Sequence, residues 1–579
     1  MKKSIAILLA ALLLTGCASA PVAQVTEEPA APTAEAPAEI PTETNPAPVY
    51  VSRFDSVTTV TLSDEGISSD SDAVYTSNDI IYYEDKTAYE SGNPYGEGTG
   101  SDRHTADEAA AHTVVNITAP GAYRITGTLS AGQIRVDLGF DAYYDPDAVV
   151  ELILEDANIT CSVAPAILFQ NVYECDGNWS TDTAQPDVDT SAAGANLILE
   201  GSSTVTGSHV AKIFKDKEGE KKLWKQDGAI YSYMSMNVFG PGSLDLTADN
   251  EGLDTELHLT LNGGDITIRS DNDGINTHED GVSVTTVNGG SLTIYAGLGA
   301  EGDGIDSNGY LVINGGSVFA SAKPMADAGL DSDLGSFIHG GTVIAAGSTM
   351  DWAESDSRQV TMNLQFASQQ AAGSEISVTD TDGNEVFSFT ANAEYNRGFS
   401  GLILSTGAFT LGKTYHIYIN GTQMAYTGTD VGFGPGGFIG GQRPGEMPQD
   451  FDPSAFENFQ PGQMPENFDR ENFQPGNFDP ENLPEGFTFP DGMTPPDSER
   501  PEGRPSSGDG KMPEGGFGGE RPGMPKDFDP SSFEDFQPGQ MPPDSEGVPG
   551  FGRQTSGEPS TEFYMSDKVN AFSGVKPAA

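Results

Sequence analysis

Positive charge is scarce in this 579-residue sequence. It holds 28 Lys and Arg residues against 86 Asp and Glu residues, which gives a formal net charge of −58 at pH 7. An excess of this size excludes nucleic acid as a natural partner and favours solubility. The length is compatible with one large repeat domain and appended segments.

Long hydrophobic runs are also scarce. The apolar run at residues 5–14 is too short to remain as a membrane-spanning helix. Lys2 and Lys3 precede it and LTGC follows it, which is the order of a secretion signal that ends in a lipobox. We therefore expect three features here: a signal peptide at residues 1–16, lipidation of Cys17 in an exported lipoprotein anchored at the bacterial cell surface, and a flexible linker at residues 17–49.

Only three cysteines are present. With Cys17 assigned to the lipid anchor, Cys161 and Cys175 remain. Two cysteines separated by a modest loop can pair in an oxidising compartment, so we expect a disulfide that staples the insertion around Trp179. Two free buried thiols are the alternative.

Helical periodicity is absent from the middle of the chain, where a glycine motif repeats instead. The motif starts at Gly240, Asn262, Asn288, Asn314 and His339, in steps of 22, 26, 26 and 25 residues. Each unit carries two short alternating apolar runs, which indicate strands with one buried face. Short strands, glycine turns and a period of about 25 residues predict an all-β fold of the parallel β-helix type.

This prediction specifies which side chains stack. A βαβ sheet is excluded by the missing helices, and a propeller blade would need roughly 40 residues. We therefore assign residues 112–357 to a parallel β-helix, in which each turn of chain lies on the one below. One buried column is then Ile266, Leu292, Val318 and Val343, and the next is Ile268, Ile294, Ala320 and Ala345.

The flanking segments differ in composition from the repeats. Residues 50–111 give mixed signals and are interpreted as an N-terminal cap. Residues 358–428 contain strand pairs around Asp-Gly and Asn-Gly turns, which predict an antiparallel β cap. Residues 429–560, rich in Gly, Pro, Asp and Phe, are expected to be disordered. Residues 561–579 regain apolar alternation and form a C-terminal segment that can return to the folded part.

Acidic turns follow the glycine-pair strands and align from one repeat to the next. Stacked strands lie ~4.8 Å apart, so carboxylates on successive rungs repel unless a cation lies between them. Half of that spacing, ~2.4 Å, is in the range of a calcium–oxygen bond. A ligand row without His or Cys favours calcium over transition metals. The expected calcium ligands are Glu251, Asp273 and Asp303 in one column and Asp254, Asn276, Asp306 and Asp331 in the other.

A simpler interpretation needs no metal, because Asp, Asn and Gly are good turn formers. We assign Asn262, Asn288 and Asn314 to this interpretation and expect them to form a hydrogen-bonded ladder. We favour calcium for the carboxylates because two aligned acidic columns exceed what a turn requires.

Lysines cluster between residues 212 and 225. Within this cluster, Lys221, Lys222, Trp224 and Lys225 offer positive charge and an aromatic face to an anionic sugar polymer. A solvated loop, balanced by its own acidic residues, is the alternative that the charge pattern favours.

The order of these motifs resembles a known family. The run LILEDANITCSVAPAILFQN, the Lys-rich loop, DGAIYSYMSMNVFGPGSLDLTADNEGLD and the NGG and DGI repeats are similar to the bacterial carbohydrate-binding β-helix family related in fold to pectate lyases. The resemblance covers residues 50–427. It implies a right-handed parallel β-helix, bound calcium, and binding to polysaccharides such as cellulose and polygalacturonate (pectin). The sequence departs from the DGI pattern at Ala328, and the segment that starts at Asp227 lacks the second ladder carboxylate.

Two functions compete. The first is non-catalytic glycan binding, in which calcium bridges the acidic protein to an acidic polymer. The second is a calcium-assisted lyase, whose base would be Lys or Arg; Arg269, Lys323 and Arg358 are the candidates. A hydrolase is less favoured because the GHG and RIK signatures of β-helical polygalacturonases are absent. We favour binding, with a structural adhesin as a third possibility, and the sequence leaves the oligomeric state open.

Overall fold

The structure, a computed structural model, describes residues 50–83, 103–214, 222–324, 327–348, 351–429 and 558–578. The chain divides into two units, Met1–Glu39 and Ile40–Ala579, and every described residue belongs to the second. The predicted signal peptide, Cys17, the linker before residue 50 and residues 430–557 of the predicted disordered region lie outside the described residues. None of the helices within the described ranges is long and apolar enough to cross a membrane.

Strands make up almost all of the regular structure. Helix is limited, in the described part of the chain, to α2 (Ala106–Ala110) and the 3-10 turn η1 (Phe140–Tyr144). A capping box starts α2: the Thr105 hydroxyl accepts from the Glu108 backbone N–H, and the Glu108 carboxylate accepts from the Thr105 N–H. The prediction of an all-β protein is confirmed.

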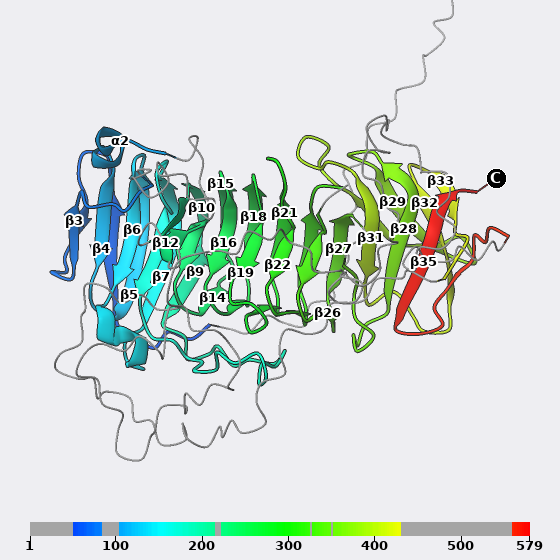
Figure 1. Ribbon diagram of the computed structural model, residues 1–579, viewed down its shortest axis with the longest axis horizontal. Helices are drawn as coiled ribbons and strands as arrows, with labels where there is room; N and C mark the ends of the chain where they lie inside the picture. The colour runs from blue at the N-terminus through cyan, green and yellow to red at the C-terminus, as the bar shows by residue number, and fades with distance from the viewer. Residues whose placement is uncertain are drawn as a thin grey trace, which may run out of the picture. The chain divides into compact units, whose positions relative to one another are not determined.

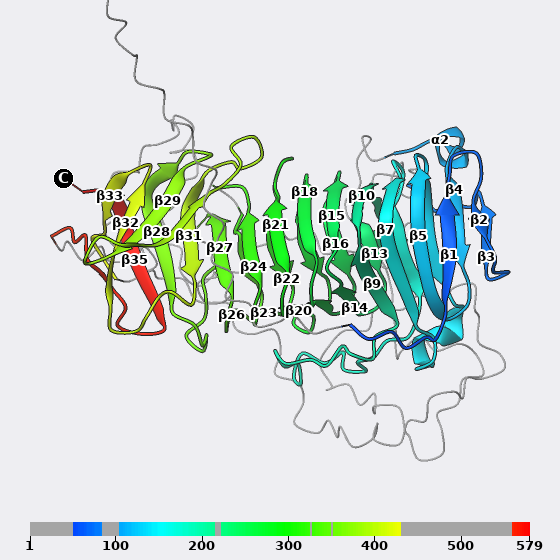
Figure 2. The same ribbon diagram turned by 180° about the vertical axis from the view of Figure 1, so that it is seen from behind.

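Two parallel ladders supply most of a 24-stranded sheet. In each ladder a strand pairs with its equivalent one repeat later, so the ladder follows the repeat directly (Figure 2). The first ladder contains β1 (Val57–Leu62), β5 (Gly121–Leu129), β7 (Val150–Thr160), β10 (Ser202–Gly207), β15 (Ser243–Ala248), β18 (Asp265–Ser270), β21 (Ser291–Tyr295), β24 (Ser317–Ser321) and β27 (Thr342–Gly347). The second continues from β7 through β9 (Ala195–Glu200), β14 (Met236–Phe239), β17 (Leu259–Leu261), β20 (Val284–Val287), β23 (Tyr310–Ile313) and β26 (Gly335–Ile338).

A third ladder forms a separate nine-stranded sheet and carries the acidic turns. All of its pairings are parallel except the one between β3 and β4 (Figure 1). Its strands are β3 (Val74–Ser77), β4 (Thr113–Ile117), β6 (Gly132–Asp137), β8 (Ile167–Asn171), β13 (Gly228–Ser232), β16 (Glu251–Thr255), β19 (Ile275–Thr277), β22 (Ile305–Ser307) and β25 (Leu330–Ser332). Outside the ladders, β2 (Ser68–Ser69) pairs with β1, and β11 (Val210–Phe214) pairs with β12 (Lys222–Gln226).

The glycine pairs are required by the way the repeats stack. Gly290, the second glycine of its pair, has φ +85, and a Cβ on it would lie 2.5 Å from the carbonyl oxygen of Gly264 in the previous repeat. Gly316 and Gly341 have φ +84 and +83 and meet the preceding repeat in the same way. Only glycine combines this backbone conformation with so close an approach.

The predicted apolar and asparagine columns are confirmed. Ile268 pairs in register with Ile294, and Ile294 with Ala320, and all three are fully buried. Burying one such aliphatic side chain stabilises a fold by about 1.5–3 kcal/mol, so the stacked column is a main source of stability. On the opposite side of the turn, Asn288 donates to Asn262 and Asn314 donates to Asn288, each at 2.9 Å.

Antiparallel strands follow the last repeat. The expected hairpins form between β29 (Glu375–Asp380) and β30 (Glu385–Thr390), and between β32 (Thr414–Ile419) and β33 (Thr422–Ala425). β31 (Phe399–Ser405) pairs antiparallel with β27 and with β28 (Thr361–Gln370). From the far end of the chain, β34 (Phe563–Tyr564) pairs with β32, and β35 (Val569–Pro577) pairs in parallel with β28. The C-terminal segment is therefore part of this module.

Candidate metal centre

The register of the third ladder brings the predicted acidic residues into columns. Asp254 pairs with Asn276, Asn276 with Asp306, and Asp306 with Asp331, on β16, β19, β22 and β25. Asp254 is fully buried, Asn276 is buried, and the last two are half-buried. This column is the one that the sequence predicts, residue by residue.

The second column lies at the start of the same strands. The Gly252 N–H donates to the Asp273 carbonyl, and the Gly274 N–H donates to the Asp303 carbonyl, which aligns Glu251, Asp273 and Asp303 on successive rungs. All three are buried or half-buried. The two predicted columns are therefore both present and adjacent.

Asp273 and Asp303 each use one carboxylate oxygen in the turns, as the simpler interpretation expects. Asp273 Oδ1 accepts from the Asp303 backbone N–H at 2.7 Å, and Asp303 Oδ1 accepts from the Ala328 N–H at 2.5 Å. These bonds use one oxygen of each carboxylate. They leave the second oxygen of the same group available to a cation.

Other ladder oxygens have no hydrogen-bond partner although they are buried. These orphaned acceptors are Glu251 Oε2, Asn276 Oδ1 and both carboxylate oxygens of Asp254. A buried polar atom without a partner is costly, and a buried unpaired charge more so. Unsatisfied oxygens gathered from both columns at this end of the ladder are an arrangement that a bound cation would satisfy.

Burial and mutual repulsion disfavour the ionised form of these acids. Burial, then the charges of Asp331 and Glu251, raises the pKa of Asp306 from 3.8 to about 8. Burial also raises the pKa of Asp254 and Asp303 well above the ordinary value, and the leading charge contributions come from Glu251 and Asp331 respectively. A cation in the ladder would oppose both effects.

The donor set fits a hard divalent cation. From β19 to β25 the ladder offers only carboxylate and amide oxygens, the ligands that calcium takes at 2.3–2.6 Å. Asp273, Asn276, Asp303, Asp306 and Asp331 are the residues that would hold it. Within the described residues, no Lys or Arg forms an ion pair with any of these five.

The N-terminal end of the ladder is different, because a lysine lies inside it. Lys225, on β12, is 1% exposed, and its Nζ forms an ion pair with Asp227 Oδ2 at 2.6 Å. The same nitrogen contacts both ring nitrogens of His278, Nε2 more closely than Nδ1, which lies at 2.9 Å. Burial would lower the pKa of Lys225, but the surrounding carboxylates, led by Asp227 and then Asp254, raise it above its usual value. Lys225 is therefore an interior residue that is paired with a carboxylate.

This position corrects the prediction that Lys225 contacts a polymer. A side chain with 1% exposure cannot meet an extended sugar chain, because the acidic residues of neighbouring rungs enclose it. Lys221 lies outside the described residues, as do the side chains of Lys222 and Trp224. Their predicted role stays a prediction.

The expected disulfide is not formed. Cys161 and Cys175 are both free, the first buried and the second half-buried. Cys161 follows the end of β7 and Cys175 follows β8, so a complete strand running across the rung separates them. The alternative of two free thiols therefore describes the structure.

Three charged or titratable residues near the ladder were not predicted as part of the site. Asp227 and His278 gather around Lys225, where a charged loop gave no sign of burial. Asp351 lies beyond the last ladder position and accepts from the hydroxyls of Ser332 and Ser336, each at 3.2 Å. Burial and the charge of Asp331 raise the pKa of Asp351 to about 7.

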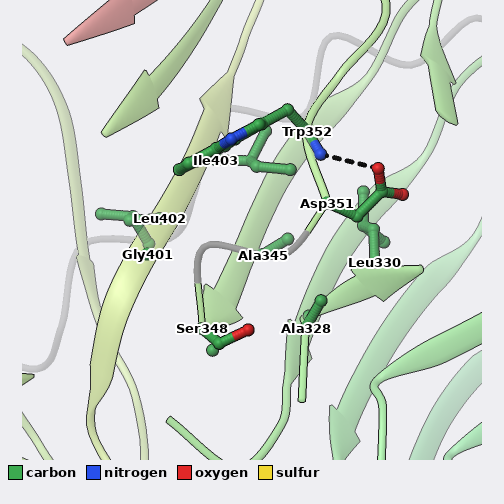
Figure 3. Close-up of a pocket in the computed structure, with 11 residues that line it drawn as sticks. Ala328, Leu330, Ala345, Ser348, Asp351, Trp352, Gly401, Leu402 and Ile403 are labelled. Carbon is green, nitrogen blue, oxygen red and sulfur yellow. Dashed lines mark hydrogen bonds between the residues drawn. The ribbon is translucent and has the colours of Figure 1, made fainter. Parts of the chain in front are cut away.

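Asp351 lines a small cavity at this C-terminal end of the repeats. Figure 3 shows its carboxylate accepting from the Trp352 backbone, with Leu330, Ala345 and Ile403 around it. The volume is about 10 Å³, enough for one water molecule and too small for a sugar ring. The cavity is therefore not a glycan site.

Comparison with known proteins points to carbohydrate-binding domains. A family model described as "Carbohydrate-binding domain-containing protein" matches residues 111–394. A carbohydrate-binding domain-containing protein of Acetivibrio thermocellus is 28% identical over 157 residues, which are 27% of this chain and 45% of that relative. The chain thus spans less than half of that relative's length.

A solved structure is also similar in part. The polysaccharide lyase-like protein from C. thermocellum, solved as a gadolinium derivative, is 19% identical, and the match covers 51% of this chain and 94% of the other at a TM-score of 0.29. A TM-score this low supports no statement about fold or function. What the comparisons establish is that residues 111–394 are similar to the carbohydrate-binding domain-containing proteins.

Proposed function

We propose that this protein binds a polysaccharide without cleaving it. The observation that carries the proposal is the match of the carbohydrate-binding family model to residues 111–394, the span that contains all three parallel ladders from β4 to β27. The three ladders are proposed to be the faces of a right-handed parallel β-helix. Repeated rungs then offer a long, regular surface, which suits a polymer better than a small sugar.

Calcium is proposed as the cation of the acidic ladder. Asp273, Asn276, Asp303, Asp306 and Asp331 would hold it, and Glu251 and Asp254 continue the two columns at their N-terminal end. The support is the set of buried oxygens without hydrogen-bond partners and the raised pKa values of the ladder carboxyls. Bound calcium would supply positive charge that neutralises these acids and lessens the repulsion between an acidic protein and an acidic polymer.

The positions of the candidate bases favour binding over lyase chemistry. Arg269 is paired with Asp245 at 2.5 Å, and its guanidinium carbon lies 4.8 Å from the centroid of the Tyr395 ring. Lys323 donates to the carbonyl of Gly299 at 3.1 Å and also to that of Ala300. Both cations are engaged away from the ladder carboxylates. A lyase that uses one of them, or Arg358, is the second candidate.

We further propose that the protein is exported and anchored through lipidated Cys17, and that the polymer is cellulose or polygalacturonate. The support for the anchor is the charge, apolar run and lipobox at residues 1–17. The support for these polymers is the motif resemblance over residues 50–427.

A sedimentation assay tests binding and turnover together. The protein is incubated with insoluble cellulose or polygalacturonate gel, in calcium or in chelator, and the supernatant is monitored for the absorbance of unsaturated sugars. Retention on one polymer that needs calcium, without any rise in absorbance, is the expected result. Rising absorbance would identify a lyase, and no retention on any acidic or neutral plant polymer would reject the proposal.

A further inference from the structure

The amino group of Lys225 lies in a position built for a cation. One ligand atom each from Asp227, Asp254 and His278 lies within 4.8 Å of the other two, which is close enough for a single metal ion to contact all three. Nζ of Lys225 occupies this space: Asp227 Oδ2 lies 2.6 Å from it, His278 Nδ1 lies 2.9 Å from it, and His278 Nε2 is in closer contact.

Asp254 shows that the position is not fully satisfied by the lysine. It is fully buried beside the carboxyl group of Glu251, no described N–H or O–H group donates to either of its oxygens, and it makes no ion pair with Lys225 within the described contacts. Lys225 stabilises its charge through space rather than by direct contact. A metal ion at the centre of the three ligands would reach it directly.

The register explains why the acidic column ends here. On the next rung towards the N-terminus, the residue paired with Asp254 is Tyr231, whose hydroxyl donates to Glu256. Asp254 therefore has an oxygen ligand on one side only, from Asn276. The lysine supplies the missing positive charge on the other side.

We propose that Lys225 is a tethered counter-ion that closes a latent divalent metal site formed by Asp227, Asp254 and His278. Two carboxylates and an imidazole make a mixed oxygen and nitrogen donor set, which suits Zn²⁺ better than calcium. The two ends of the ladder therefore differ in chemistry. From β19 to β25 the available ligands are all oxygen atoms, whereas at β12 to β16 the amino group of Lys225 fills the site. This inference does not depend on polysaccharide binding.

The test is a count of bound Zn²⁺ after equilibrium dialysis in excess calcium, for wild type and three variants. Lys225→Met removes the amino group but keeps most of its volume, and one additional Zn²⁺ per chain is expected. His278→Ala should leave the wild-type count unchanged, because the lysine already closes the site. The double variant Lys225→Met/His278→Ala should lose the additional ion.

Two outcomes would overturn the proposal. One is a folded Lys225→Met protein, by circular dichroism, that binds no more Zn²⁺ than wild type. The other is a wild-type protein whose Zn²⁺ count falls by one in His278→Ala or Asp227→Asn, since the site would then already be open. The second comparison needs no lysine variant, so it can still overturn the proposal if Lys225→Met fails to fold. In that case Lys225→Gln replaces Lys225→Met in the first comparison.

Discussion

Asn276 donates through Nδ2 to Oε1 of Glu251 at 3.1 Å, between neighbouring rungs of the acidic ladder. Oε2 of Glu251 and Oδ1 of Asn276 are left buried and without partners. One hydrogen bond thus fixes both side chains and presents their free oxygens to the column. Because residue 276 is an amide and not a carboxylate, the column carries one negative charge fewer.

Replacing that amide by a carboxylate should make the protein depend more strongly on calcium. Asn276→Asp places a charge in register between Asp254 and Asp306, so melting temperature in chelator should fall below that of wild type, while the rise on adding calcium should grow. Thermal melts in chelator and in calcium give both values. The matched control is Asn262→Asp in the asparagine column, which lies after β17 and β20. This substitution keeps an oxygen acceptor for Asn288. An equal calcium response in both variants would contradict a cation near Asn276.

Removing ladder carboxylates should have the opposite effect. Asp303→Asn and Asp306→Asn are expected to abolish most of the calcium-dependent rise in melting temperature. A ligand at one hundred times its Kd stabilises the folded state by about 2.7 kcal/mol per site. The variants should lose a calcium-dependent stabilisation of about this size for each site removed. Asp382→Asn, at an exposed hairpin turn, is the charge-matched control. If all three variants keep the wild-type calcium response, the columns are turn-forming residues and no more.

Without calcium, stability should fall as the pH rises. The pKa of Asp306 is raised to about 8 and that of Asp351 to about 7, from 3.8 for each. The folded state therefore binds more protons than the unfolded chain between pH ~4 and pH ~8, and its free energy of unfolding decreases across that window, by up to about 1.4 kcal/mol per group and pH unit. The stabilisation is fully present below pH ~4 and is lost as the pH passes 8. Chemical denaturation in chelator at several pH values measures this slope.

Calcium and one substitution serve as controls for the pH series. Calcium binds the ionised form, so saturating calcium should reduce or reverse the slope. Asp306→Asn should remove the part of the slope that lies nearest pH 8. A stability in chelator that rises steadily from pH 4 to pH 8 would show that these carboxyls are not buried as described.

The repeat registers could be predicted because local sequence determines them. The position of each glycine pair fixes where a strand starts, and alternation fixes which side chains point inwards, so the pairing of Asp254 with Asn276 follows from counting. The Asn288 and Asn262 contact follows in the same way. No long-range information is needed for residues that stack on their own equivalents.

The errors arose where the environment comes from other rungs. Lys225 belongs to a segment that reads as a solvated loop, and its burial depends on Asp227, Asp254 and His278 from three different turns of chain. The expected Cys161 to Cys175 bond ignored β8, whose length separates the two thiols. Local periodicity predicts where strands form, but it does not predict which side chains from different repeats meet.

Two free thiols should make the protein insensitive to reductant. Reducing agent is expected to leave the melting temperature unchanged, and alkylation in denaturant should label both Cys161 and Cys175, as mass spectrometry of peptides would report. In the native state Cys161 should react slowly, because burial removes access and raises its pKa to about 11. A peptide pair that is released only by reductant would contradict the free-thiol arrangement.

The C-terminal strand should contribute much of the stability of the antiparallel module. Phe572 on β35 is 2% exposed, and its ring centroid lies 4.8 Å from that of Tyr426 and 5.0 Å from that of Phe563. Phe572→Ala is therefore expected to lower the free energy of unfolding by about 3–5 kcal/mol, because it removes a packed aromatic ring and leaves a cavity. Tyr564→Ala is the control, since Tyr564, on β34, is 51% exposed and its loss should cost little. Equal denaturation midpoints for the two variants would show that β35 does not pack as described, whereas a large loss for Phe572→Ala alone would mean that any working fragment must include residues 558–578.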